Sequence, residues 1–151
     1  MLIEILVAAG LVVVTVAIHA AGFDALLRAI VRSHALAFTG FRPVILLVIG
    51  LTCWLILIHL TEICLWGLFY LWRDCLPDAE SAFYFSAGAY TTIGSGDLVL
   101  PKPWRMLAPL EALTAVLMFG LSTGLFFAVV SRWIANWMQN RPHQNLTPWC
   151  Q

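Results

Sequence analysis

Three long apolar stretches constrain this chain more than any other feature. They cover residues 5–23, 44–72 and 106–131, and the middle stretch contains no Lys or Arg. About 20 helical residues are enough to cross the hydrocarbon core of a bilayer, which is about 30 Å thick. The sequence therefore predicts an all-α membrane protein with three transmembrane helices.

The composition excludes several classes of protein. Hydrophobic residues make up 62% of the chain and charged residues 11%, whereas soluble domains contain about 25% charged residues. Eight Lys and Arg residues balance eight Asp and Glu residues, so the basic surplus typical of nucleic-acid-binding proteins is absent. The residue spacing indicates no Ser/His/Asp, Cys/His or metal-ligand constellation. We therefore expect no enzyme activity, no cofactor and no nucleic-acid partner.

The segments outside the long apolar stretches have distinct patterns. Residues 1–22 lack a basic start and contain Glu4, which favours a retained transmembrane helix over a cleaved signal peptide. Residues 23–43 place apolar residues at helical spacing with arginines on the other side, which predicts a cytoplasmic interfacial amphipathic helix. A loop with a basic bias is the alternative for this segment. Residues 132–151 are expected to form a short cytoplasmic tail.

Charges at the ends of the apolar stretches predict the topology in the cell (inner) membrane. The segment over residues 73–105 carries more acidic than basic residues, and the side formed by the first linker and the tail carries one acid, Asp24. By the positive-inside rule the latter side is cytoplasmic, which places the N-terminus outside and the C-terminus inside. The arginines of that side are Arg28, Arg32, Arg42, Arg132 and Arg141.

A short apolar segment between the last two long stretches is too short to span a membrane. Pro77 and Asp78 offer a helix start, residues 81–91 predict a short helix, and residues 94–97 read Gly-Ser-Gly-Asp. Non-helical backbone at membrane depth is tolerated only where protein buries it or water and ions line it. We therefore expect a re-entrant helix followed by a loop whose carbonyl oxygens can face one axis, since glycine accepts a positive φ.

The sequence Thr91-Thr92-Ile93-Gly94-Ser95-Gly96-Asp97 resembles the selectivity filter of potassium channels, whose pattern is T-[TX]-[VI]-G-Y-G-D. The resemblance extends over residues 44–132 and, more narrowly, to small bacterial channels with an extra leading helix. It implies a pore domain over residues 44–131, with an outer helix, a re-entrant pore helix, a filter at residues 91–97 and an inner helix. One extra transmembrane helix precedes this domain.

The same resemblance implies four copies around one axis, because each chain supplies one filter strand. The expected assembly is a homotetramer in membrane lipid that conducts monovalent cations. Its partners are K⁺, and Na⁺ if the filter is widened. The filter residues Thr92, Ile93, Gly94, Ser95 and Gly96 would bind the ion, and Thr91 and Asp97 would support the filter.

Ser95 departs from the family pattern, which has tyrosine at this position. The family tyrosine packs against pore-helix aromatics, and serine cannot fill that volume. Tyr84, Phe85 and Tyr90 are candidates to fill it, and water is the alternative. Three outcomes stay open: retained potassium selectivity, a widened filter that also passes Na⁺, or a collapsed filter. We expect reduced selectivity.

Two other functions compete with a conducting channel. The first is a non-conducting or regulatory membrane subunit with a degenerate filter. The second is a potassium transporter subunit, which the single filter segment makes a weaker candidate because such transporters usually carry four pore repeats in one chain. No arginine-rich spanning segment is present, so we expect no voltage sensor.

Polar residues inside the apolar stretches are further candidates. Glu62 and His59 share a helix face and predict either a structural clamp behind the pore, which is favoured, or a proton-sensitive gate. Glu111 is expected either to brace the pore helix or filter, or to snorkel to the interface. Gly120 and Gly124 predict a gating hinge or a close-packing face. Ser122 and Thr123 would either line the cavity or bond back to helix carbonyls.

Overall fold

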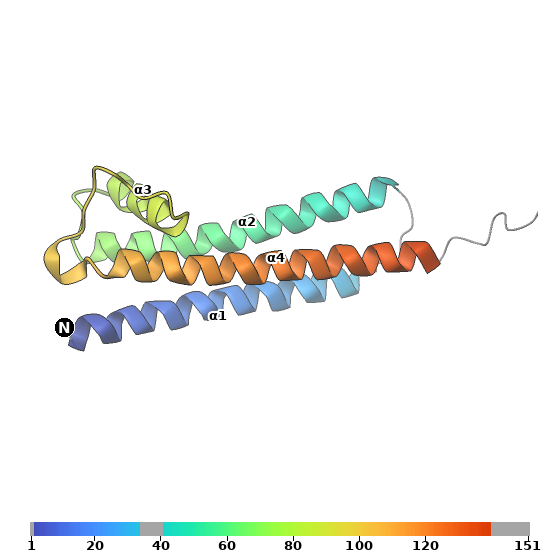
Figure 1. Ribbon diagram of the computed structural model, residues 1–151, viewed down its shortest axis with the longest axis horizontal. Helices are drawn as coiled ribbons and strands as arrows, with labels where there is room; N and C mark the ends of the chain where they lie inside the picture. The colour runs from blue at the N-terminus through green and yellow to red at the C-terminus, as the bar shows by residue number, and fades with distance from the viewer. Residues whose placement is uncertain (1, 34–40, 140–151) are drawn as a thin grey trace, which may run out of the picture.

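Helices make up most of the computed structural model, which describes residues 2–33 and 41–139. Helices α1, α2 and α4 lie side by side as long rods, and the short helix α3 packs against α2 and α4 near one end (Figure 1). The described residues contain no strand. This confirms the prediction of an all-α protein. The elements are α1 (Leu2–Arg32), α2 (Phe41–Trp72), α3 (Ala79–Tyr90), the 3₁₀ helix η1 (Lys102–Trp104) and α4 (Leu107–Gln139).

The long helices are long and apolar enough to cross a membrane, over Glu4–Arg32, Val44–Trp72 and Lys102–Gln139. Large apolar side chains on their outer faces are exposed in the single chain, such as Phe127 at 72% and Leu46 at 70%. Such faces are stable only against lipid or another protein surface. These features indicate a multi-pass membrane protein.

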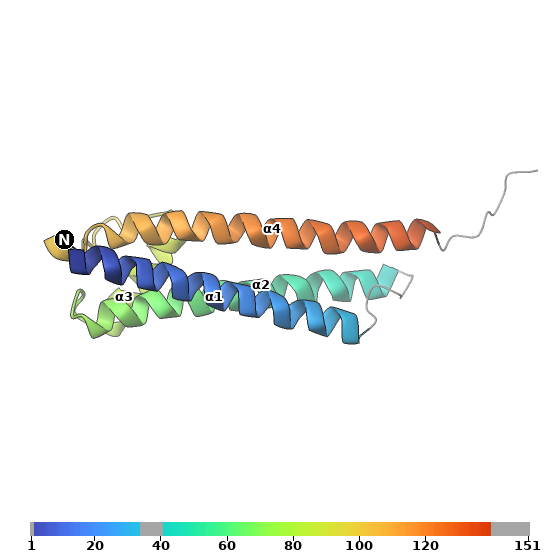
Figure 2. The ribbon, with the colours of Figure 1, turned by 90° about the horizontal axis from the view of Figure 1, so that it is seen from below.

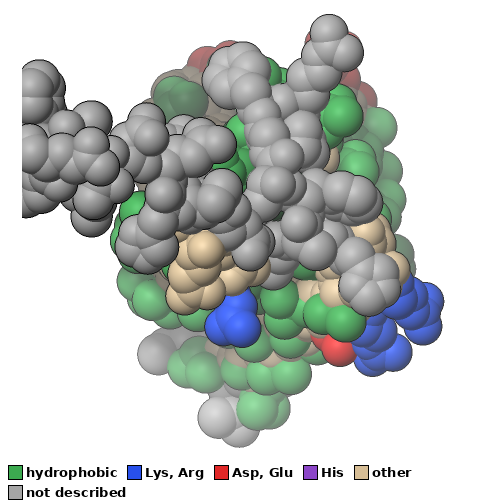
Figure 3. All heavy atoms as spheres, turned by 90° about the vertical axis from the view of Figure 1, so that its right-hand side faces the viewer, with side chains coloured by type: hydrophobic (Ala, Val, Ile, Leu, Met, Phe, Trp, Pro, Cys, Tyr) green, Lys and Arg blue, Asp and Glu red, His purple; other side chains and the backbone are tan. Residues whose placement is uncertain are grey.

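The long helices alternate in direction along the chain. Helix α2 runs opposite to α1 and α4, so the N-terminus lies at the same end of the bundle as α3 and η1 (Figures 1 and 2). Lys and Arg side chains are visible at the other end, which Figure 3 shows from outside. The arrangement is compatible with the predicted topology, in which the arginine-rich end is cytoplasmic.

Helix α1 is longer than the sequence pattern predicts. A separate amphipathic helix or loop from residue 23 is wrong for the described part, because α1 continues without a break to Arg32. No proline interrupts these residues, and a single glycine such as Gly22 costs a helix only about 1 kcal/mol. Asp24 and Arg28 form an i,i+4 pair on the exposed face of this continuation. Residues 34–40 of the predicted segment, like the tail from 140, lie outside the described residues.

Helix α3 begins where its sequence favours a start. Asp78 is the N-cap, and its side chain accepts a hydrogen bond from the Ser81 backbone N–H at 2.8 Å. The helix then lies close to α2, because Gly67 leaves room for the Phe83 ring, which comes within 2.6 Å of where a Cβ on Gly67 would stand. The observed helix starts two residues before the predicted one and ends one residue before it.

The bundle buries two apolar clusters with polar side chains between them. One cluster includes Trp66, Tyr70 and Phe85 near α3, and the other includes Leu55 and Ile58 toward the opposite end. Each long helix contributes apolar residues to both clusters, and its buried polar residues lie between those two sets of positions. The buried polar residues of the three long helices are Thr15, His19, Glu62, Glu111, Thr114 and Ser122.

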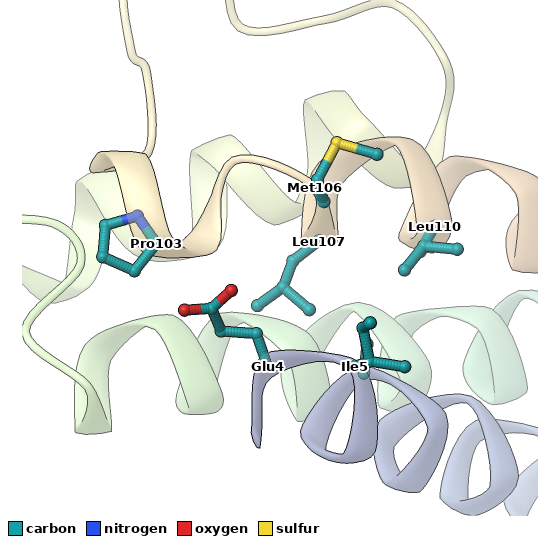
Figure 4. Close-up of a pocket in the computed structure, with 7 residues that line it drawn as sticks. Glu4, Ile5, Pro103, Met106, Leu107 and Leu110 are labelled. Atoms are coloured by element: carbon teal, nitrogen blue, oxygen red, sulfur yellow. The ribbon is translucent and has the colours of Figure 1, made fainter. Parts of the chain in front are cut away.

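An apolar pocket of about 290 Å³ lies between the first turns of α1 and the η1–α4 junction (Figure 4). It is apolar apart from Glu4. The pocket contains neither the residues of the 91–97 loop nor the buried polar residues of the bundle. Its lining residues are Glu4, Ile5, Ala8, Pro103, Met106, Leu107 and Leu110.

Candidate functional site

The loop over residues 91–97 folds back against the last turns of α3. The Gly94 N–H donates a hydrogen bond to the Gly88 carbonyl at 2.9 Å, and the Asp97 N–H donates to the Ser95 carbonyl at 2.6 Å. Gly88 has no side chain at the contact, where a Cβ would stand 2.9 Å from Ser95 Oγ. Close approach of helix and loop therefore depends on this glycine.

The loop backbone alternates in handedness. Thr92, Gly94 and Gly96 have φ angles of 62°, 81° and 60°, whereas the residues between them have no positive φ. In an ordinary extended chain, successive residues face opposite sides. The alternating sign of φ shows that the loop is not an ordinary extended strand. The positive φ at Thr92 is uncommon for a β-branched residue, and the two glycines adopt it freely.

Most of the loop is open to its surroundings in the single chain. Ile93 is 84% exposed, and Thr91, Thr92, Gly94 and Gly96 are exposed as well. An apolar side chain as exposed as Ile93 leaves a face that a second protein surface could cover. The hydrogen bonds described above hold the loop against α3.

Ser95 is the buried residue of the loop. Its side chain points toward α3, and the hydroxyl donates a hydrogen bond to the Phe85 carbonyl at 3.3 Å. An open pocket of about 320 Å³ lies between this part of the loop, α3 and the start of α4, lined by Phe85, Ser95 and Pro109 among others. The serine therefore satisfies its hydroxyl and leaves the space beside it unfilled.

The aromatic residues predicted to fill this space have different surroundings. Phe85 lines the pocket and contacts the Tyr70 ring edge-on. Tyr84 is 58% exposed, and Tyr90 donates its hydroxyl to Glu62 on α2. Tyr84 and Tyr90 do not line the pocket, because α3 turns them to other faces.

Asp97 lies on the surface at the end of the loop. It lines an open pocket of about 440 Å³ with Asp78 and Glu80. The side chain is exposed, so it does not stand behind the loop in the single chain. The three carboxylates instead give this surface a negative potential.

A cluster of polar side chains surrounds Glu62 in the middle of the bundle. One carboxylate oxygen lies 2.8 Å from His19 Nδ1, and the other lies 3.3 Å from His59 Nδ1. The Tyr90 hydroxyl also lies 2.9 Å from His59 Nδ1. Glu62 is fully buried and His19 is 2% exposed. The cluster ties α1 and α2 to the last residue of α3.

Ser122 on α4 closes the cluster on the other side of the two imidazole rings. Its Oγ lies 3.4 Å from His19 Nε2 and 3.1 Å from His59 Nε2. This is neither of the two roles predicted for Ser122, whereas Thr123 does bond back to the Phe119 carbonyl at 2.8 Å. All four helices thus contribute to the cluster.

His19 is not among the candidates that the sequence analysis selects, although it lies within the first apolar stretch. An ionisable residue within a spanning segment is by default a functional candidate that faces the bundle interior. That argument selected Glu62, and applied to His19 it would have selected the partner as well. Which residue faces which across two helices depends on their packing, which spacing along one helix does not contain.

Glu111 on α4 is fully buried and holds α3 in place. Its carboxylate accepts hydrogen bonds from the Ser86 hydroxyl at 2.6 Å and from the Tyr70 hydroxyl at 2.7 Å. Of the two predicted roles, this geometry corresponds to bracing the short helix, since the side chain does not reach the surface of the single chain.

Gly120 and Gly124 lie on an exposed face of α4, which is continuous through both positions. A Cβ added at either residue would meet nothing within 4 Å. The two glycines therefore pack against no other helix of the same chain among the described residues.

Comparison with known protein families agrees with this geometry. Residues 58–132 match the family model described as an ion channel. The matched ion channel domain begins in the second half of α2, includes α3 and the 91–97 loop, and ends in α4. It contains Glu62 and Glu111 but not α1 or His19. Comparison with curated proteins and with solved structures gives no match.

Proposed function

We propose that four copies of this chain form a cation channel of the potassium-channel type in the cell membrane. The carbonyl oxygens of Thr92, Ile93, Gly94, Ser95 and Gly96 line its filter. The observation that carries the proposal is the alternation of backbone handedness at Thr92, Gly94 and Gly96. The alternation supports the proposal, because a short loop must leave the ordinary extended conformation to turn several carbonyls toward an ion and replace its hydration shell.

The exposure of the loop supports assembly around an axis. One chain supplies one row of carbonyls, and an ion needs oxygens on all sides. In the tetramer, the open face of the loop meets its three symmetry copies, and contact between neighbouring copies would cover Ile93. Oligomers with closed rotational symmetry satisfy all such surfaces at once.

The local electrostatics favour cations. Helix α3 ends at Tyr90, directly before the filter, so the negative end of its dipole faces the ion path. Asp78, Glu80 and Asp97 line one surface pocket beyond the loop, and their charge raises the local concentration of cations there. This end of the bundle faces outward in the proposed topology, with the N-terminus outside and the C-terminus in the cytoplasm.

Ser95 sets the selectivity in this proposal. In the single chain, an open pocket of about 320 Å³ lies beside it, and the proposal holds that a neighbouring copy does not replace the tight packing that a large side chain would give. Protein atoms that line unfilled space lose contacts and restrain their neighbours less. We therefore expect the filter to conduct both K⁺ and Na⁺.

Ion flux into liposomes tests the proposal directly. The full chain is reconstituted with K⁺ or Na⁺ as the only permeant ion, beside the variants Ser95→Tyr and Ser33→Tyr. Ser33 directly follows α1 in the sequence, and α1 ends at the opposite end of the bundle from α3 (Figure 1), so this variant controls for the added ring. We expect the wild type and S33Y to conduct both ions and S95Y to conduct mainly K⁺.

The other outcomes separate the alternatives. Strong preference of the wild type for K⁺ contradicts the role of Ser95 but keeps the channel. Absence of flux in the wild type and in both variants favours a non-conducting membrane subunit. The oligomer mass in nanodiscs, expected at four times 16.8 kDa, tests the assembly separately.

A further inference from the structure

We propose that His19, His59 and Glu62 form a binding site for a divalent transition-metal ion of the zinc class. The site lies in the middle of the bundle and would join α1 to α2. Its residues are separate from the 91–97 loop, and His19 lies outside the matched ion channel domain. The proposal therefore does not depend on the proposed function.

The two imidazole nitrogens and the carboxylate group already stand near the distances that such an ion requires. His19 Nδ1 lies 2.8 Å from one Glu62 oxygen and His59 Nδ1 lies 3.3 Å from the other. Ligand atoms from all three residues lie within 4.8 Å of one another. Around Zn²⁺, bonds of about 2.0–2.1 Å in a tetrahedron separate the ligand atoms by about 3.3 Å. Small side-chain movements would therefore complete the site.

The ligand types select the class of metal. Two imidazoles and one carboxylate suit Zn²⁺ and its first-row neighbours. Ca²⁺ and Mg²⁺ prefer a shell of oxygens, which this cluster does not supply. The Tyr90 hydroxyl, 2.9 Å from His59 Nδ1, stands beside the site and is available as a fourth ligand.

Ser122 is placed to hydrogen-bond both imidazoles on the side away from the metal, as an outer-shell partner does. If both Nδ1 atoms bind the metal, both Nε2 atoms carry a proton and need an acceptor. The Ser122 Oγ faces both Nε2 atoms, at 3.4 Å and 3.1 Å, and a hydroxyl oxygen has two lone pairs. Such outer-shell contacts fix the ring orientation and support metal affinity.

The charge of the site also favours a cation. Glu62 is fully buried, and within the described part of the chain its ion pairs are both with imidazoles. Its other hydrogen-bond partner among the described residues is the Tyr90 hydroxyl, which carries no positive charge. A divalent ion supplies positive charge between the three ligands.

Metal titration of the full-length chain tests the site. The protein, purified in nanodiscs and freed of metal with a chelator, is titrated with Zn²⁺ by calorimetry and with Co²⁺ by visible absorption. We expect one ion per chain and the intense absorption of tetrahedral Co²⁺. Loss of an outer-shell partner typically weakens metal binding by about 10- to 100-fold. Loss of a ligand in H19Q, H59Q or E62Q should weaken it further, by about 100-fold or more.

Matched controls separate this site from other ligands in the chain. E80Q removes an exposed carboxylate, and H34Q/H143Q removes the two histidines outside the described residues; both should bind as the wild type does. His19→Cys should keep the ion and add a sulfur-to-cobalt charge-transfer band, a signature that loss of structure cannot produce. Circular dichroism and elution volume verify that each variant is folded.

Several results would overturn the proposal. The first is absence of binding by the wild type, which would mean that the cluster is a hydrogen-bonded network only. The second is binding that survives in H19Q and E62Q. The third is binding lost in H34Q/H143Q, which would place the ion elsewhere. None of these readouts requires ion flux, so failure of the proposed channel function is recognised separately.

Discussion

The Ser86 hydroxyl on α3 lies 2.6 Å from a carboxylate oxygen of Glu111 on α4, and both side chains are fully buried. The Tyr70 hydroxyl on α2 donates to the other carboxylate oxygen at 2.7 Å. Three helices therefore meet at one carboxylate. Because α3 directly precedes the 91–97 loop, this contact sets where the loop begins.

Replacing Glu111 by Ala should destabilise the protein by about 1–3 kcal/mol, because the Tyr70 hydroxyl is left buried without an acceptor. The measurement is the midpoint of thermal unfolding in detergent, followed by circular dichroism. We expect E111A also to reduce ion flux, since the position of α3 is no longer fixed.

Glu111→Gln is the matched variant for this test. Its amide oxygen can still accept from Tyr70, and its amide nitrogen can donate to Ser86, whose own hydroxyl reaches the Ile63 carbonyl at 2.9 Å. The variant should therefore unfold close to the wild type. An equal loss in E111A and E111Q would show that the carboxylate charge, not the hydrogen bonding, holds the helices together.

Gly88→Ala should disturb the loop. The new Cβ would stand 2.9 Å from Ser95 Oγ and 3.2 Å from the Gly94 carbonyl carbon, and such overpacking costs about 1–3 kcal/mol. Liposome flux should fall, while Gly10→Ala, which meets nothing within 4 Å, should leave flux unchanged.

The double variant G88A/S95A identifies the cause of that effect. Removing the Ser95 hydroxyl relieves the shortest of these contacts, so flux should recover in part, and the two substitutions should be non-additive. Purely additive effects would place the disturbance at the Gly94 backbone or within α3 itself.

The long helices and the N-cap of α3 can be predicted from the sequence, because each depends on residues that are close together in the chain. Runs of apolar residues of sufficient length and the Asp78 N-cap need no knowledge of the tertiary structure. The sequence pattern does not predict the extension of α1 to Arg32. Near residue 23 the pattern changes from apolar residues on every face to apolar residues on one face, which resembles the end of a helix. A helix can change the character of its surface without a break in its backbone.

Of the buried polar contacts around Glu62, the sequence predicts the one within a helix but not those between helices. His59 and Glu62 are three residues apart on one helix, and periodicity is enough to bring them together. His19 and Ser122 reach the same cluster from α1 and α4, and Gly22 lets α1 approach Ile58 on α2. Such contacts depend on the rotation of each helix about its axis. A hydropathy pattern that is apolar on nearly every face does not determine that rotation.

Asp78 should give α3 a stability that depends on pH. Hydrogen bonds from the Ser81 backbone and side chain lower the pKa of the Asp78 carboxyl. Because the folded-state pKa lies below the unfolded one, the stabilisation is present above the unfolded pKa and is lost as the pH falls through the folded value. Thermal unfolding at a series of acidic pH values measures this loss.

Asp78→Asn is expected to flatten that pH dependence. Asparagine caps a helix about as well as aspartate but does not titrate, so stability at neutral pH should change little. Glu80→Gln, in the same first turn, is the control for loss of an acidic side chain near the helix start. If D78N loses thermal stability at acidic pH as the wild type does, the pH dependence belongs to another carboxyl.

Gly120→Ala should lower ion flux without changing the oligomer. A glycine inside a helix costs about 0.5–1 kcal/mol relative to alanine, so the substitution stiffens α4 and shifts a bending equilibrium about two- to fivefold. A Cβ at this position meets nothing within 4 Å in the single chain, and the same holds for Gly50 on α2. Gly50→Ala therefore controls for added helix stability and should leave flux unchanged. A change in oligomer mass for G120A would instead assign the exposed face of α4 to contacts between copies, because only a neighbouring chain could then meet the added methyl group.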